Sequence, residues 1–157
     1  MPRVLIFCLF AVAVTACTGE AASRYFQLCL TEDVDRRALE TMLEQYAYDL
    51  DLEFSAATAE DKDWNRQVSG QTDPVSVHVK EDGEHFILAG NMTMGDAQIM
   101  IAVFEGRNDP VRVRLANELG RRLQEKWDML ETIAPEGGGV QQLENCPYRP
   151  WPFPLSG

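Results

Sequence analysis

The stretch of sequence that decides the fold is PVSVHVKEDGEHFILAGN, residues 74–91. Its first half alternates valine with polar residues, which is the pattern of a strand that buries one face. Asp82-Gly83 is typical of a two-residue turn between antiparallel strands, so the chain is expected to reverse direction here. On the returning strand, two further apolar side chains are expected on the valine face. The buried positions predicted for this hairpin are Val75, Val77, Val79, Phe86 and Leu88.

Three more strands are predicted around the hairpin. Residues 25–30 are a short aromatic and aliphatic run, and residues 52–56 alternate apolar with polar side chains. Residues 98–104 are mostly apolar on both faces, which is typical of a central, doubly covered strand. The polar residues 59–73, which include Trp64, are expected to form a loop.

Two amphipathic helices are predicted, one over residues 31–50 and one over residues 109–134. Thr31 is the expected N-cap of the first helix, and Asp109, followed by proline, is that of the second. Each helix carries apolar side chains three or four residues apart on one face. Gly120 lies inside the second helix, where the missing side chain is expected to let the helix approach the sheet closely.

These elements predict an α+β fold in which two helices pack on one face of a largely antiparallel sheet of about five strands. A single domain over residues 25–134 contains all of them. Residues 135–157 are rich in glycine and proline and are expected to form a tail that is neither helix nor central strand.

Composition narrows the class of protein. The chain has 157 residues, 45% of them hydrophobic, with 14 Lys and Arg against 25 Asp and Glu and a net charge of -11. This amount of apolar sequence fits one folded domain rather than a disordered chain. A strongly acidic chain is not expected to bind nucleic acid, because phosphate binding depends on clustered Lys and Arg.

The first 16 residues are expected to be an export signal. Arg3 is followed by an apolar run over residues 4–14, which is long enough for a secretory signal but too short to span a bilayer. Val14-Thr15-Ala16-Cys17 resembles the lipobox of bacterial lipoproteins. The resemblance implies cleavage of residues 1–16 and attachment of lipid to Cys17. An ordinary secretory signal followed by a chance cysteine is the alternative.

The same resemblance implies a location. In the lipoprotein family, aspartate after the lipidated cysteine retains the protein at the inner membrane, and here Thr18 follows Cys17. We therefore expect a lipid-anchored protein of the bacterial cell envelope, in the outer membrane and facing the periplasm. Residues 17–24 are expected to be a short tether. Two or more acyl chains anchor a protein to a membrane stably.

Cys29 and Cys146 are the thiols that remain in the chain after cleavage and lipidation. Export to an oxidising compartment favours a disulfide between them, which would fix the tail to the first strand. A redox-active or metal-binding thiol pair is the alternative, although the sequence contains no CxxC and no neighbouring histidine.

The tail alternates proline with aromatic residues, and an extended conformation of this kind suits partner binding. The candidate partner-binding residues are Tyr148, Trp151 and Phe153. Alternatively, these rings fold back and cover an apolar part of the domain, because exposed aromatic clusters favour aggregation.

No metal or other cofactor is predicted. His78 and His85 are expected to be diagonal neighbours on the sheet face opposite the valines, but no third ligand is placed beside them. Met92, Met94 and Met100 include one pair of the kind found in copper carriers, and packing is the interpretation that we prefer.

The sequence predicts no catalytic residues. We expect a non-enzymatic domain that binds a protein partner, either as an assembly accessory or as an inhibitor that neutralises a basic toxin. The alternative is a small envelope hydrolase acting on cell-wall or saccharide material, with carboxylates such as Asp61 and Asp63 beside Trp64.

Overall fold

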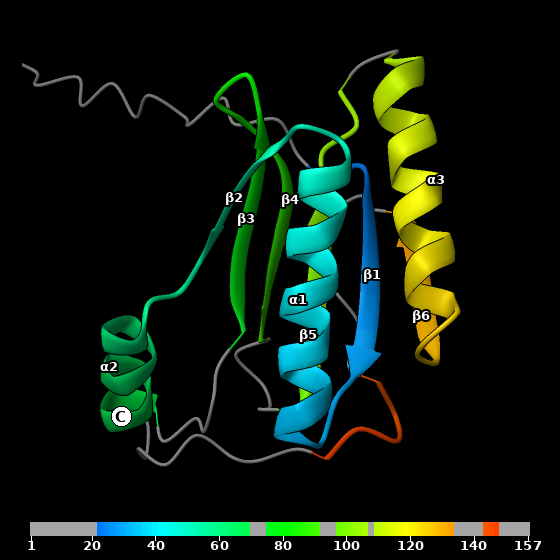
Figure 1. Ribbon diagram of the computed structural model, residues 1–157. Helices are drawn as coiled ribbons and strands as arrows, with labels where there is room; N and C mark the ends of the chain where they lie inside the picture. Colours follow the sequence, from blue (N-terminus) through cyan, green and yellow to red (C-terminus); the bar gives the residue numbers. More distant parts are fainter. Residues whose placement is uncertain (1–21, 70–74, 92–96, 107–108, 134–142, 148–157) are drawn as a thin grey trace, which may run out of the picture.

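The computed structural model describes residues 22–69, 75–91, 97–106, 109–133 and 143–147 (Figure 1). These residues form strands and helices in the order β1 (Arg24–Cys29), α1 (Asp33–Asp49), β2 (Glu53–Ala56), α2 (Ala59–Ser69), β3 (Ser76–Glu81), β4 (Glu84–Asn91), β5 (Gln98–Val103), α3 (Pro110–Gln124) and β6 (Met129–Ile133).

The strands form one antiparallel sheet in the order β2-β3-β4-β5-β1-β6. Helices α1 and α3 cover one face of it and run in opposite directions (Figure 1). The predicted α+β class is therefore confirmed, with six strands and three helices in the described residues instead of about five strands and two helices. Strand β5 lies inside the sheet, as its apolar sequence indicates.

The core fills the space between the sheet and these two helices. Phe26 and Leu28 of β1 are fully buried, as are Leu119 and Leu123 of α3. Tyr46 of α1 is buried among them, and its hydroxyl donates a hydrogen bond of 2.8 Å to a backbone carbonyl of α3. Burial raises the pKa of the Tyr46 hydroxyl, which keeps this donor protonated. Each large side chain buried in this way contributes roughly 1.5–3 kcal/mol.

Gly120 confirms the close approach that was predicted for the second helix. A Cβ atom at this position would lie 3.2 Å from Cζ of Phe26, which is closer than ordinary packing allows. Because Phe26 is fully buried, its ring has little room to move aside. Helix α3 can therefore lie this close to β1 because Gly120 has no side chain.

The hairpin between β3 and β4 has the predicted turn, with positive φ angles at Asp82 and Gly83. The prediction that Phe86 and Leu88 share the valine face is right for Phe86, which is buried in the same core as the valines, and wrong for Leu88. A bulge shifts the register after Val79, so that Ile87 lies opposite Val79, and both Phe86 and Ile87 are fully buried while Leu88 is only partly buried.

Residues 59–73 were predicted to be a loop, but residues 59–69 form helix α2. The helix is polar and largely exposed, so it lacks the apolar spacing by which amphipathic helices are recognised. Its start does carry a sequence signal, since Thr58 and Asp61 have the spacing of a capping box.

The prediction of one helix over residues 109–134 is also wrong at its end. Helix α3 stops at Gln124, and residues 129–133 form β6 beside β1. Trp127 and Leu130 continue the helical spacing of the preceding residues, but Leu130 is 44% exposed. Pairing with β1 gives this segment its backbone hydrogen bonds, and the adjacent β-branched residues Thr132 and Ile133 suit a strand.

One of the two predicted helix N-caps is confirmed by the structure. The Asp109 carboxylate caps α3, accepting hydrogen bonds of 2.9 and 3.2 Å from the amides of the second and third helical residues. The N-cap of α1 is Glu32, without a side-chain cap, and not Thr31.

The domain begins earlier than predicted. Arg24 is the first residue of β1, and Ser23 is already bonded to the sheet, with its amide and hydroxyl donating to the Val103 carbonyl. Ala22 is buried. Residues 22–24, which were predicted to belong to the tether, are therefore part of the folded domain.

A disulfide joins Cys29, the last residue of β1, to Cys146, with the two Cα atoms 5.5 Å apart. Nearby, the amide of Leu143 donates a hydrogen bond of 3.2 Å to the side chain of Gln98. The described part of the tail, residues 143–147, is thus held at the end of β1. The disulfide closes a loop with a sequence separation of 117 residues.

Replacing Gly120 with Ala is expected to destabilise the protein by about 1 kcal/mol. Overpacking against Phe26 costs roughly 1–3 kcal/mol, and the better helix propensity of Ala offsets about 1 kcal/mol of this. Urea denaturation gives the free energy of unfolding. In a Phe26→Leu background the added methyl has room, so the two substitutions should be non-additive. Additive effects would contradict the contact.

Replacing Cys146 with Ser is expected to lower the free energy of unfolding by roughly 4–5 kcal/mol, because the reduced chain regains the entropy of a very long loop. The double variant Cys29→Ser/Cys146→Ser is the control without a free thiol and should be equally unstable. Detection of freely alkylatable thiols at both positions in the unreduced, denatured protein would refute the disulfide.

Candidate functional site

Helix α2 carries an exposed tryptophan, Trp64, together with exposed acidic side chains. It lies beside the sheet at the end opposite the β3–β4 turn (Figure 1). A reciprocal cap fixes its start: the amide and hydroxyl of Thr58 donate to the Asp61 carboxylate at 3.0 and 2.7 Å, and the amide of Asp61 donates to the Thr58 hydroxyl at 3.2 Å. Lys62 then joins the helix to α1 through an ion pair of 2.9 Å with Glu40.

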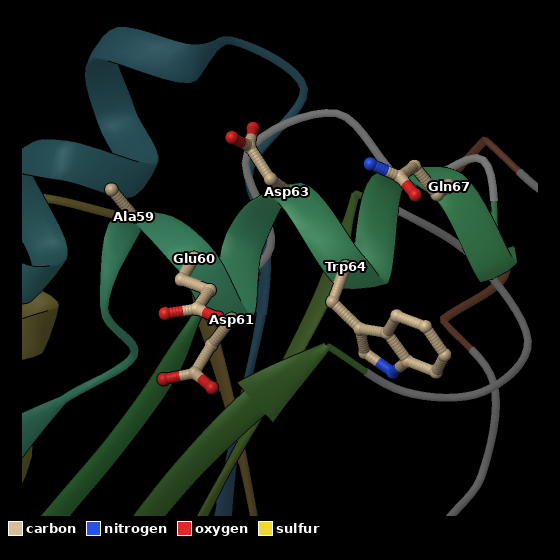
Figure 2. Close-up of a pocket in the computed structure, with 6 residues that line it drawn as sticks. All are labelled: Ala59, Glu60, Asp61, Asp63, Trp64 and Gln67. Carbon is tan, nitrogen blue, oxygen red and sulfur yellow. The ribbon is translucent and has the colours of Figure 1, made fainter.

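An open depression of about 640 Å³ lies along α2, lined by Ala59, Glu60, Asp61, Asp63, Trp64 and Gln67 (Figure 2). Glu60, Trp64 and Gln67 recur at the spacing of one helix face. The Trp64 side chain is 65% exposed, and it is not among the residues that pack on the core. A large aromatic ring is thus held at the surface, beside carboxylates, without a packing role in the core.

The carboxylates of this helix do not form a converging pair. Figure 2 shows Asp61 beside Glu60 on one side of the helix and Asp63 on the other. Hydrogen bonds from Thr58 lower the pKa of Asp61, so this group is a carboxylate cap and a poor proton donor near neutral pH. A hydrolase of the kind predicted as the alternative needs two acids that face each other across a cleft, and Asp61 and Asp63 lack this arrangement.

A second, smaller depression of about 330 Å³ adjoins the first and shares Asp61 with it. Ser55 of β2 and Ser76 and His78 of β3 also line it. The ring centroids of His78 and His85 are 5.4 Å apart, so the predicted proximity of the two histidines is confirmed. Burial, and then the charges of His85 and Lys80, lower the pKa of His78.

The described residues contain no group of three or more His, Cys, Asp or Glu side chains that could hold a metal ion. The histidine pair therefore has no third ligand in this part of the chain. Met100 lies in β5 and is partly buried. Met92 and Met94 lie outside the described residues.

Several of the predicted site residues also lie outside the described residues. They are the lipid-attachment residue Cys17 and the candidate partner-binding residues Tyr148, Trp151 and Phe153. The structure adds the surface of α2 to the candidate sites. The sequence signal that could have revealed it is the capping spacing of Thr58 and Asp61, which predicts a helix and therefore places Glu60 and Trp64 on one face.

No protein-family model matches the chain, and no match is found among curated proteins or among solved structures. In the part of the chain that the structure describes, every helix is too short or too polar to cross a membrane.

Replacing Thr58 with Ala is expected to fray the start of α2 and to cost about 1 kcal/mol of local stability, as for other N-cap deletions. Amide hydrogen exchange over residues 60–63 measures the effect, and Thr58→Ser should retain protection. Because the pKa of Asp61 is lowered in the folded state, the cap is intact above pH of about 4 and weakens as the pH falls further. Unchanged exchange in Thr58→Ala would disprove the capping role.

Proposed function

We propose that this protein is a lipid-anchored protein of the bacterial cell envelope whose domain binds a basic protein partner. The anchor is supported by the sequence, in which an export signal ends at a lipobox-like segment with Cys17 as its cysteine. Cleavage before Cys17 removes Arg3 and no carboxylate, so the net charge changes from -11 to -12. A domain with this charge attracts basic proteins and is repelled by anionic lipid headgroups.

The observation that carries the binding proposal is the exposed Trp64 in an acidic depression. Tryptophan is enriched among the residues that dominate protein–protein interfaces, because a large rigid ring buries much area at low entropic cost. A second observation agrees with binding rather than hydrolysis, since Asp61 is held as a helix cap and Asp63 points away from it. The tail residues Tyr148, Trp151 and Phe153 remain candidates for a second contact with the same partner.

The geometry of the domain suits an anchor at its N-terminal end. Four residues lie between Cys17 and the folded Ala22, so the two are five residue steps apart and this tether spans at most about 18 Å. Strand β1 begins at the same end of the sheet as the β3–β4 turn, whereas α2 and Cys146 lie at the opposite end (Figure 1). On a lipid anchor, the start of β1 would face the membrane, and the Trp64 depression would lie on the far side, accessible from the periplasm.

The Cys17→Ser variant is expected to lose the lipid and to appear in the soluble fraction or as an uncleaved chain, while the wild-type protein partitions into detergent. The wild-type protein isolated from its own membranes should retain a basic protein, which mass spectrometry identifies. Replacement of Trp151 and Phe153 with Ala tests the contribution of the tail to that recovery. Lipid-modified Cys17→Ser protein in the membrane fraction would disprove the anchor, and the absence of any retained protein would disprove the binding role.

A further inference from the structure

His78 and His85 are the two histidines of the chain, and the fold brings their rings together. His78 lies on β3 and His85 on β4, on the sheet face opposite the buried valines of this hairpin. The turn and the bulge of the hairpin set the register, in which His78 pairs with Leu88 and His85 with Lys80. The ring centroids of the two histidines are 5.4 Å apart, and both residues are exposed.

This separation fits two rings that share one metal ion. A metal–nitrogen bond of roughly 2.0–2.1 Å puts the ion about 3.2 Å from the centroid of each coordinating imidazole, so the two centroids lie at most about 6.4 Å apart. At the observed 5.4 Å, the angle between the two rings at the ion is about 115°, which is close to tetrahedral. Exposed imidazole rings turn about χ2 at low cost, so a nitrogen of each ring can be directed at the same point.

The charges around the pair favour a cation over an anion as ligand. Burial, and then the charges of His85 and Lys80, lower the pKa of His78, so its imidazole is neutral near neutral pH. A metal ion binds the neutral ring, whereas an anion such as phosphate needs protonated rings as donors. Lys80, the positive neighbour on this face, lies opposite Glu53 of β2 in the sheet register. The net charge of -11 also attracts cations to the domain.

We propose that His78 and His85 together chelate one divalent transition-metal ion, with one nitrogen from each ring and water in the remaining positions. Imidazole suits Cu²⁺, Ni²⁺ and Zn²⁺, and of these Cu²⁺ is bound most tightly. Mg²⁺ and Ca²⁺ prefer oxygen ligands and are not expected to bind here. Cys29 and Cys146 do not compete for the ion, because they are joined in the disulfide. This inference is independent of the proposed function.

The test is a titration of the complete lipidated protein with copper(II) chloride, in micelles of a neutral detergent, followed by calorimetry and by pulsed electron paramagnetic resonance. The wild type is expected to bind one Cu²⁺ tightly and to show coupling of the copper to two imidazoles. His78→Gln and His85→Gln should each show coupling to one imidazole. Each should also lower the affinity about tenfold or more, because the second ring acts at a high effective concentration when it is held beside the first.

Lys80→Gln is the matched control, because it changes a residue on the same face of β3 and keeps both rings. It should retain the coupling to two imidazoles and bind Cu²⁺ at least as tightly as the wild type. Without metal, the wild type and both histidine variants should have the same melting temperature, since the two residues are exposed. With Ni²⁺, the melting temperature of the wild type should rise above that of either variant, because an ion bound to the folded hairpin stabilises it.

Three outcomes would overturn the proposal. Two tightly bound Cu²⁺ ions in the wild type, each coupled to one imidazole, would mean that the rings bind ions separately. Unchanged affinity in His78→Gln or in His85→Gln would place the ion on other side chains. A shift of the imidazole NMR signals with sodium phosphate, and none with Zn²⁺, would assign the pair to an anion. The titration needs no partner protein, so its failure leaves the proposed function intact, and failure to recover a partner leaves the metal site intact.

Discussion

Strand β1 is hydrogen-bonded on both sides by strands that the chain reaches only much later, and this constraint organises the molecule. Arg24 pairs with Val103 of β5 and with Ile133 of β6. Contacts between such distant segments carry a large cost in loop-closure entropy, which must be recovered by burial. Phe26 and Leu28 supply that burial, and the disulfide at Cys29 lowers the entropy of the unfolded chain at the same place.

The position of β1 also dictates how α3 must lie. Because α3 connects two strands that flank β1, it crosses over β1 on the helical face, and Gly120 provides the clearance above Phe26. The guanidinium of Arg24 lies in the same region. It donates a hydrogen bond to Asn117 at 2.8 Å and forms ion pairs with Glu105 and Glu131. This one side chain of β1 therefore contacts both α3 and the edge strand β6. The partly buried position of this cluster makes it stronger than an exposed ion pair.

Local sequence signals predicted the parts of the fold that local geometry determines. The Asp82-Gly83 turn, the Asp109 cap and the close approach at Gly120 each depend on one or two residues and were correctly anticipated. The bulge at Phe86 and the edge strand β6 depend on pairing with distant strands, so periodicity alone could not reveal them.

At the candidate site, too, the sequence predicted one part of the arrangement and missed another. The sequence indicated Trp64 and the acidic residues around it as candidates. The relative positions of these side chains, however, depend on whether the segment is a loop or a helix. Only the helix places Glu60 one turn before Trp64 and directs Asp63 away from Asp61 (Figure 2). The tail was predicted to be a binding segment that a disulfide fixes to the first strand. The described residues include the fixed part of the tail, at Cys146.

The disulfide has a mechanical consequence. If the protein is held by lipid on Cys17 and pulled by a partner on the residues after Cys146, tension enters at the start of β1 and leaves through the bond between Cys29 and Cys146. That path is covalent throughout and uses only the residues from Cys17 to Cys29. The segment between Cys29 and Cys146, which contains both core helices and the other strands, lies outside the line of force. Such a domain can transmit tension between a membrane and a partner without loading the hydrogen bonds that hold its sheet together.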